Sequence, residues 1–290
     1  MEEIMTKAPA KINLTLDVTG RRENGYHDLR MLMQTIDLCD EVTLTKTDTP
    51  GIQFTMNKVL PDGCPPDKNL VYKAADLMLQ KYSIPGGIQI YLNKQIPAAA
   101  GLAGGSTDCA ATLLAINTLY ELDIDISELC EIGVTLGADV PFCICQGTML
   151  SEGIGEILTP LPDLSPLWAL LIKPNISVST AYVYTHLDLE HLSYHPETDR
   201  LIEYIKRKDA AAVARGLSNV LETVTIPEHP EIAEIKTFLQ ENAAIGSLMS
   251  GSGPTTYGLY QDEIQARMAY KQALKQYPDY DVILCQTKRP

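Results

Sequence analysis

The first part of the chain, to about residue 60, alternates apolar and polar residues in the manner of β-strands. A period of two places successive side chains on opposite faces of a sheet. We therefore expect strands separated by polar turns here. The apolar positions of the two clearest runs are Ile12, Leu14, Leu16 and Val18, and then Val42 and Leu44.

Helical spacing and further strand-like runs alternate over the rest of the chain. A helix is expected from Asp67-Lys-Asn69-Leu70 to just before Pro85, and another after the glycine-rich segment near residue 104, capped by Ser106 or Thr107. Ser127 is expected to cap a short helix that ends at Gly137. The remaining helices are expected to start at Thr180 and to span 200–217 and 230–241, and the remaining strands to span 87–92, 167–172, 244–249, 257–260 and 282–284.

Prolines mark one place where the chain is expected to pass between domains. Residues 160–166 contain three prolines, and a buried strand is expected to begin directly after them. A chain of 290 residues is long enough for two domains. We therefore expect an α+β protein with domains at 1–160 and 161–290 and no internal repeat.

The composition narrows the class of protein. The formal net charge of −14 argues against nucleic acid and anionic membranes as partners, because both favour basic surfaces. Seven cysteines without CxxC spacing indicate reduced thiols, and Cys143 and Cys145 are expected in a buried strand. The acidic N-terminus has no apolar signal segment, and the longest apolar run, 167–172, is too short to cross a bilayer. We expect a cytoplasmic protein, as a monomer or weak homodimer.

The most informative segment is residues 97–108, PAAAGLAGGSTD, which joins an expected strand to an alanine-rich helix. Glycines let backbone N–H groups turn toward a ligand, and the first helical turn adds unpaired N–H donors and a positive dipole end. These features suit a polyphosphate. The segment matches neither GxxxxGK[ST] nor GxGxxG. The acidic composition repels a phosphorylated substrate, so local donors must attract it: the loop, Lys11, Arg21, Arg22 and Lys94.

Three further motifs accompany the loop: APAKINLTL from Ala8 with NGYHDL from Asn24, GADVPF from Gly137, and SLMSGSGPT from Ser247. Together the four motifs resemble the GHMP small-molecule kinases, from Ala8 to about Tyr260. The pairing of PAKINLTL with GYH is most similar to the branch that phosphorylates cytidine diphosphate methylerythritol. Ala103 and Asn24 depart from the family pattern, and the substitution at 103 leaves open whether that residue has a positive φ.

The resemblance implies a two-domain fold, with a ribosomal-protein-S5-like N-terminal domain for ATP and a ferredoxin-like C-terminal domain for the substrate. It implies ATP and Mg²⁺ as cofactors and cytidine diphosphate methylerythritol as the small-molecule substrate. Two alternatives stay open: a GHMP kinase for another alcohol, such as homoserine or mevalonate, and a non-catalytic nucleotide-binding protein. A dinucleotide oxidoreductase is disfavoured because no acidic ribose ligand follows a suitable strand.

Site residues follow from the matched motifs. Lys11 and Asp139 match the catalytic positions, with Asp139 as the base or as a group that only orients the hydroxyl. A cation beside the carboxylate would keep it ionised. Ser106 or Thr107 is expected to bind Mg²⁺ through its hydroxyl. The positions expected to bind ATP are Pro97, Gly101, Leu102, Ala103, Gly104, Gly105, Ser106, Thr107, Asn69 and Lys94.

The acceptor is expected to contact Asn13, Asp139, Tyr26, His27 and Tyr184. Asn13 shares a strand face with Lys11, because the side-chain period is two. The resemblance assigns a stacking face to Tyr26, a base-edge hydrogen bond to His27 and a second stacking ring to Tyr184, with Tyr182 as the alternative. Three other histidines at helical spacing, His186, His191 and His195, are interpreted as a solvated helix end and not as metal ligands.

Overall fold

Two long N-terminal strands, β1 (Glu3–Arg21) and β2 (His27–Thr47), each contribute to both compact units of the chain. The computed structural model describes residues 2–58 and 65–288. Its contacts define unit 1 (Met1–Ala10, Leu38–Ala98, Ala103–Cys145) and unit 2 (Lys11–Asp37, Ala99–Leu102, Gln146–Pro290). The expected N-terminal strands are confirmed, and they are longer than the alternating runs alone suggested.

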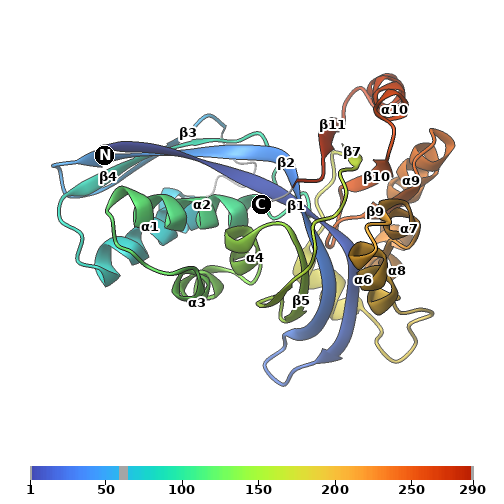
Figure 1. The fold of residues 1–290 in the computed structure, drawn as a ribbon, viewed down its shortest axis with the longest axis horizontal. Coiled ribbons are helices and arrows are strands. Elements are labelled where there is room, and N and C mark those ends of the chain that lie inside the picture. The colour runs from blue at the N-terminus through green and yellow to red at the C-terminus, as the bar shows by residue number, and fades with distance from the viewer. Residues whose placement is uncertain (1, 59–64, 289–290) are drawn as a thin grey trace. The chain divides into compact units, whose positions relative to one another are not determined.

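In its described residues, unit 1 combines part of a sheet with four α-helices. β3 (Gly51–Met56) pairs in parallel with β4 (Gly87–Asn93), which pairs antiparallel with residues 41–47 of β2. Figure 1 shows α1 and α2 along one face of this sheet. The helical elements are the 3-10 turn η1 (Pro66–Lys68), α1 (Leu70–Lys81), α2 (Gly104–Leu119), α3 (Ile126–Leu136) and α4 (Val140–Cys145).

Two local expectations in unit 1 are wrong. Asp125, not Ser127, caps α3, because its side chain accepts the N–H of Glu128, and the Ser127 hydroxyl donates to Asp125 instead. The run that contains Cys143 and Cys145 is the short helix α4 and not a strand. A short apolar run has no periodicity that distinguishes a helix from a strand, so only packing decides which of the two forms.

Unit 2 contains a four-stranded antiparallel sheet of order β11-β7-β10-β9. Its strands are β7 (Trp168–Lys173), β9 (Gly246–Met249), β10 (Thr256–Tyr260) and β11 (Asp281–Gln286). Helices α9 (Glu231–Glu241) and α10 (Glu263–Gln276) pack against it (Figure 1). Their apolar side chains form one core with the strands: Leu170, Ile172, Ile235, Leu239, Tyr260, Ala266, Ala269 and Ala273.

The rest of unit 2 connects this sheet to the N-terminal strands. Residues 29–34 of β2 pair with β5 (Thr148–Gly153), which pairs with β6 (Ile157–Pro160), and residues 15 and 16 of β1 pair in parallel with β8 (Ser218–Asn219). The single helix expected over 200–217 is wrong, because Lys208 has a φ of 58°. The helices here are α5 (Thr180–His186), α6 (Thr198–Lys206), α7 (Ala210–Arg215) and α8 (Glu222–Glu228).

The proline-rich segment at 161–166 has no helix or strand and lies within unit 2. The N–H of Leu161 donates to the backbone oxygen of Thr148, and the side chain of Leu164 is buried. The functional division at residue 160 stays a prediction.

The middle of β1 is buried on both faces. Its apolar face contains the expected residues from Ile12 to Val18. The polar face is buried as well, with Lys11 5% exposed, Asn13 0%, Thr15 0% and Asp17 7%. Burial of polar groups is unfavourable unless they are hydrogen-bonded, so these side chains must have partners.

Candidate active site

The glycine-rich loop is shaped by backbone conformations that side chains disfavour. Gly101 has a φ of 72°, and a Cβ there would lie 2.1 Å from the backbone oxygen of Ser250. Ala103 has a φ of 57°, which answers the question that its substitution left open. Glycine is therefore required at 101 by packing within unit 2.

Helix α2 begins without a side-chain cap. Its N-cap residue is Ala103, so the expected cap by Ser106 or Thr107 is wrong. Thr107 lies inside the first turn, is 1% exposed, and donates its hydroxyl to the backbone oxygen of Pro9 at 2.7 Å. The first-turn N–H groups, from Gly104 onward, have no partner within the helix and suit an anion.

The start of α1 lies beside the start of α2 within unit 1. Asn69 caps α1, and its side chain accepts the N–H of Val71 at 2.9 Å. A Cβ on Gly105 would lie 3.8 Å from Leu70, the next residue after Asn69. Asn69 and the glycine loop, both expected at the nucleotide site, are thus neighbours, whereas Pro97 lies in the connection before α2.

A buried charged cluster, Lys94 with Asp40 and Asp108, supports the start of α2. The Lys94 ammonium donates to Asp108 at 2.7 Å and also to Asp40. Burial by itself lowers the pKa of Lys94, but the two carboxylates outweigh it and raise the net value. Burial raises the pKa of Asp108 to about 8, against the opposing attraction of Lys94. A Cβ on Gly104 would lie 3.3 Å from the Lys94 nitrogen.

A second buried cluster joins three of the four motifs inside unit 2. The Lys11 ammonium donates to the Asn13 side chain at 2.8 Å and to the backbone oxygen of Gly101 at 3.2 Å. The N–H of Gly251 donates to the same Asn13 oxygen at 3.1 Å, and the Ser250 hydroxyl donates to Gly101 O at 3.0 Å. The expected shared face of Lys11 and Asn13 is confirmed.

Asp139 lies between α3 and α4 in unit 1 and is half-buried. Its backbone oxygen accepts the N–H of Cys143 and so starts α4. A Cβ on Gly137 would lie 3.8 Å from the Ser106 hydroxyl, so this turn adjoins the first turn of α2. Its pairing with Lys11, which belongs to unit 2, stays a prediction.

His27 and Tyr184 come together in unit 2. Their ring centroids are 5.3 Å apart with an interplanar angle of 31°. His27 is 8% exposed, and burial, with a smaller contribution from Arg21, lowers its pKa. Tyr26, in the turn between β1 and β2, is 57% exposed. The alternative ring, Tyr182, stacks on His186 and donates to Glu228, so Tyr184 is the ring that accompanies His27.

The other histidines have separate partners. His191 contacts Asp188 and His195 contacts Asp17, both at 2.9 Å, and both histidines lie outside helices. Only His186 is at a helix end, so the interpretation as one solvated helix end is wrong for the other two. Residues 2–58 and 65–288 contain no group of three or more His, Cys, Asp or Glu that could hold a metal ion.

Comparison with known proteins shows which family these motifs belong to. The GHMP kinases N terminal domain matches residues 69–147, and the GHMP kinases C terminal domain matches residues 192–279. A 4-diphosphocytidyl-2-C-methyl-D-erythritol kinase of Lachnospira eligens is 51% identical over 277 residues, 95% of each chain. One from Acetivibrio thermocellus is 49% identical over 93% of this chain and 95% of its own.

The chain belongs to the GHMP kinase family.

Solved structures agree with this membership. A 4-(cytidine 5'-diphospho)-2C-methyl-D-erythritol kinase superposes with a TM-score of 0.83 at 33% identity, over 98% of this chain and all of the other. A homoserine kinase from Cytophaga hutchinsonii has the same fold, with a TM-score of 0.77 at 21% identity, over 100% of this chain and 95% of the other. The expected α+β GHMP kinase fold is confirmed, and membership implies ATP as a substrate. Residue 160 falls between the two matched segments.

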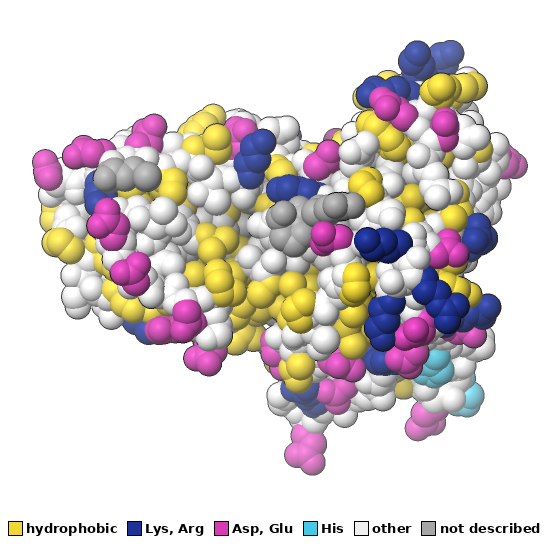
Figure 2. Space-filling view, in the orientation of Figure 1, with side chains coloured by type: hydrophobic (Ala, Val, Ile, Leu, Met, Phe, Trp, Pro, Cys, Tyr) yellow, Lys and Arg dark blue, Asp and Glu magenta, His cyan; other side chains and the backbone are white. Residues whose placement is uncertain are grey.

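Sequence reasoning missed several residues that support the matched motifs within each unit. Asp108 lies in the quoted loop motif, but nothing in the sequence pairs it with Asp40 or Lys94. Asn219 and Glu222, which hold the third motif, lie in a stretch with no recognisable signal. Figure 2 shows acidic side chains scattered among lysines and arginines on one face, so the net charge does not gather into a single patch there. Along the described parts of the chain, no helix has both the length and the apolar character needed to span a membrane.

Proposed function

We propose that this GHMP kinase transfers the γ-phosphoryl group of ATP to the 2-hydroxyl of 4-diphosphocytidyl-2-C-methyl-D-erythritol, a step of isoprenoid precursor synthesis. The observation that carries the choice of substrate is the His27–Tyr184 ring pair, formed by the GYH motif and α5. Relatives 43–51% identical that have this substrate in their names support it.

Cytosine recognition follows from the chemistry of this ring pair. The lowered pKa of His27 keeps the imidazole neutral near pH 7, so one ring nitrogen is an acceptor. Cytosine presents an exocyclic amine as a donor where uracil presents an oxygen. We propose that His27 accepts from this amine, while Tyr184 and the exposed Tyr26 provide stacking faces.

For the chemical step, we propose that Lys11, Asn13 and Asp139 act on the acceptor hydroxyl. Asp139 takes the hydroxyl proton as the oxygen attacks the γ-phosphorus, and ADP leaves. Lys11 stabilises the charge that develops on the transferred group, and its bond to Asn13 fixes its direction. Asn13 also positions the hydroxyl.

ATP binding is assigned to the glycine loop and the neighbouring start of α1. The uncapped N–H groups at Gly104, Gly105 and Ser106 suit the phosphates, with Leu102 and Ala103 shaping the approach. Asn69 and Lys94 are proposed on the adenine side, and Pro97 is proposed to contact ATP. The Lys94 ammonium is already engaged by two carboxylates, which limits its role toward adenine to positioning.

The first turn of α2 offers one hydroxyl that suits Mg²⁺ as a ligand. Thr107 is buried and its proton goes to Pro9, whereas Ser106 is partly exposed and lies beside the turn that leads to Asp139. Ser106 is therefore the proposed protein ligand. When bound, Mg²⁺ would neutralise charge on the phosphate oxygens.

The remaining expectations are proposals about partners. The acidic composition favours a small-molecule substrate over nucleic acid or membrane surfaces. We also propose a cytoplasmic location, because seven cysteines without CxxC spacing indicate reduced thiols, and a monomer or weak homodimer as the oligomeric state.

ADP release in a coupled assay tests the function. We expect turnover with ATP and 4-diphosphocytidyl-2-C-methyl-D-erythritol and none with mevalonate or homoserine. Asp139→Asn should lower kcat roughly 10²–10⁴-fold with little change in KM, because the carboxylate acts in the transition state. His27→Ala should raise the KM of the cytidine substrate and reduce its preference over the uridine form. Turnover of mevalonate or homoserine instead would overturn the choice of substrate.

A further inference from the structure

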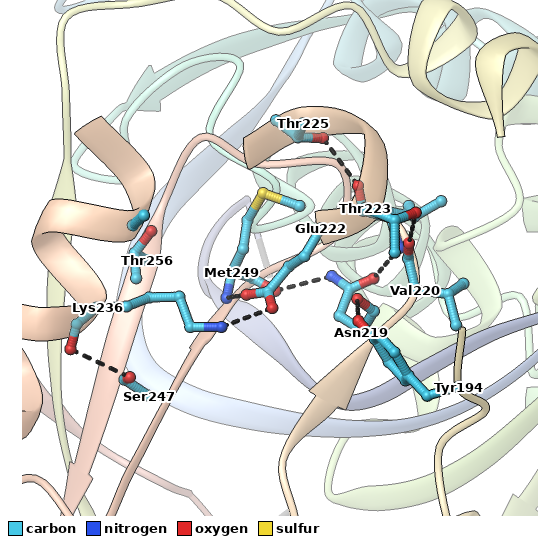
Figure 3. A network of polar contacts seen from close by, with 12 residues as sticks. Tyr194, Asn219, Val220, Glu222, Thr223, Thr225, Lys236, Ser247, Met249 and Thr256 are labelled. Carbon is cyan, nitrogen blue, oxygen red and sulfur yellow. Dashed lines mark hydrogen bonds and ion pairs between the residues drawn. The ribbon is translucent and has the colours of Figure 1, made fainter. Parts of the chain in front are cut away.

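Two side chains outside the four motifs hold the third motif, SGSG at 250–253. Asn219 is 0% exposed and Glu222 is 9% exposed, although both are polar. Figure 3 shows both of them beside Met249, the last residue of β9 before the glycine turn. Buried polar groups require partners, and here the partners are the backbone of the motif itself.

The contacts fix the backbone at the entry to the turn. The Asn219 amide donates to the backbone oxygens of Met249 at 2.9 Å and Gly251 at 2.8 Å. The Glu222 carboxylate accepts the N–H of Met249 at 2.9 Å, and its other oxygen accepts from Lys236 at 2.6 Å. Both backbone groups of Met249 are therefore bound by buried side chains.

Asn219 is itself held in place on β1. It lies opposite Leu16 in the parallel pairing of β8 with β1, and the N–H of Val220 donates to Leu16 O. Its side-chain oxygen accepts the N–H of Leu221 at 2.9 Å, which orients the amide so that its nitrogen faces the turn. Loss of the nitrogen alone would leave this last bond intact.

The 250–253 turn also contacts the residues that we propose for phosphoryl transfer. The N–H of Gly251 donates to the Asn13 oxygen that also accepts from Lys11, and the Ser250 hydroxyl donates to Gly101 O, a second acceptor of Lys11. A displaced turn would therefore shift two acceptors of the Lys11 ammonium.

We propose that Asn219 is a positioning residue for phosphoryl transfer, which holds the 250–253 turn so that Asn13 and Gly101 direct Lys11, with Glu222 as its supporting partner. This inference rests on the proposed function, because it acts through Lys11. It assigns no contact with substrate to either side chain.

The test is a double-mutant cycle in kcat with Asn219→Asp and Lys11→Met. Aspartate keeps the shape and the acceptor for Leu221 but loses both donors to the turn. We expect Asn219→Asp alone to lower kcat about 10–100-fold with KM values changed less than about threefold. In the Lys11→Met background the same change should alter kcat less than about twofold, because the group that it positions is absent.

Tyr194→Phe is the matched control. It removes a hydroxyl that donates to the backbone oxygen of Asn219 at 2.7 Å but leaves the amide contacts with the turn. Its kcat should stay within about twofold of wild type. Glu222→Gln, with the same cycle, serves if Asn219→Asp does not fold. Its single amide oxygen cannot accept from both Met249 and Lys236 as the two carboxylate oxygens do, so the variant should lower kcat only when Lys11 is present.

The outcomes separate the two proposals. A wild-type kcat for Asn219→Asp, or an equal loss of kcat with and without Lys11, overturns the positioning role while the proposed function stands. An equal loss in Tyr194→Phe overturns it as well, since β8 in general would then be responsible. A wild-type kcat for Lys11→Met overturns both the role of Lys11 and the inference built on it.

Discussion

The two ends of the glycine-rich loop are held by different physical means, although they are only a few residues apart in sequence. At the first end, Gly101 is packed against Ser250, and its oxygen accepts from Lys11. At the second end, Gly104 lies over Lys94, which is bound by Asp40 and Asp108. Close backbone packing and hydrogen bonds to neutral oxygens are found at the first end, and a buried cluster of charges at the second.

This difference separates two kinds of buried lysine. Lys94 contacts two carboxyl groups that cannot reach water, so its charge serves the stability of unit 1. Lys11 donates to an amide oxygen and a backbone oxygen, and we assign its charge to the reaction. Although the two lysines are similarly buried, substitution of Lys94 should therefore mainly lower stability, and substitution of Lys11 should mainly lower kcat.

The largest effect is expected from exchange of each lysine for methionine. Lys94→Met leaves a buried carboxylate without its counter-charge and should lower the free energy of unfolding by about 3–5 kcal/mol. Lys11→Met should cost about 1 kcal/mol of stability but lower kcat roughly 10²–10³-fold. Urea unfolding and steady-state kinetics on both variants measure the two quantities. Similar stability losses in the two variants would contradict the comparison.

Gly101→Ala should have the next largest effect. The left-handed φ and the 2.1 Å approach to Ser250 O add strain and overlap, which together should cost about 2–4 kcal/mol of stability. Thermal unfolding with and without ATP measures the loss. If the variant unfolds at the same temperature as wild type, the conclusion that Gly101 packs too tightly against Ser250 for a side chain is wrong.

A pH dependence of stability should distinguish the charged end. The pKa of Asp108 is about 8 when folded, against a usual 3.8, so between these values the unfolded carboxyl is ionised and the folded one keeps its proton. Raising the pH then favours the unfolded state, by up to roughly 1.4 kcal/mol per pH unit from this group. The stability cost of Asp108→Asn should therefore shrink as the pH rises from 5 to 8.

Asp125→Asn provides the control for this experiment. The backbone N–H of Glu128 lowers the pKa of Asp125, so its carboxyl is ionised in both states above the usual value. The stability cost of this substitution should stay constant over the same pH range. A constant cost for Asp108→Asn as well would contradict the raised pKa.

The smallest effect is expected from Gly105→Ala. A Cβ there would make only an ordinary contact of 3.8 Å with Leu70, so folding should be unchanged. A methyl group near the phosphates should still cost about 1 kcal/mol of ATP binding, or roughly a fivefold rise in the KM of ATP. The KM of the cytidine substrate should not change. Gly104 is a poorer choice, because a Cβ there also presses on Lys94 and Ile96. An unchanged KM for ATP would place the phosphates elsewhere.

Local patterns in the sequence were sufficient for much of the fold. The alternation of Ile12, Leu14 and Leu16 predicted β1, and Asn69 marked the start of α1. The glycine loop, the shared face of Lys11 and Asn13, and the pairing of His27 with Tyr184 were also accessible, because motifs or a two-residue period encode them. The loop and the shared face depend on neighbours in sequence or on a fixed geometric repeat, whereas the pair of His27 with Tyr184 was expected from the resemblance to the GHMP kinases.

Tertiary structure decided what local patterns could not express. Residues 140–145 form a helix, although their sequence is equally compatible with a strand, because packing decides between the two. The positive φ of Lys208 interrupts a run of residues whose sequence pattern is helical throughout. The polar face of β1 reads as solvent-exposed by alternation, yet it is buried because other segments of unit 2 supply its hydrogen bonds. Asp40 meets Lys94, and Asn219 meets Gly251, across distances in sequence that no local pattern spans. The sequence by itself determined the elements and the chemical groups of this kinase, and only the fold decided which buried groups neutralise one another and which face the reaction.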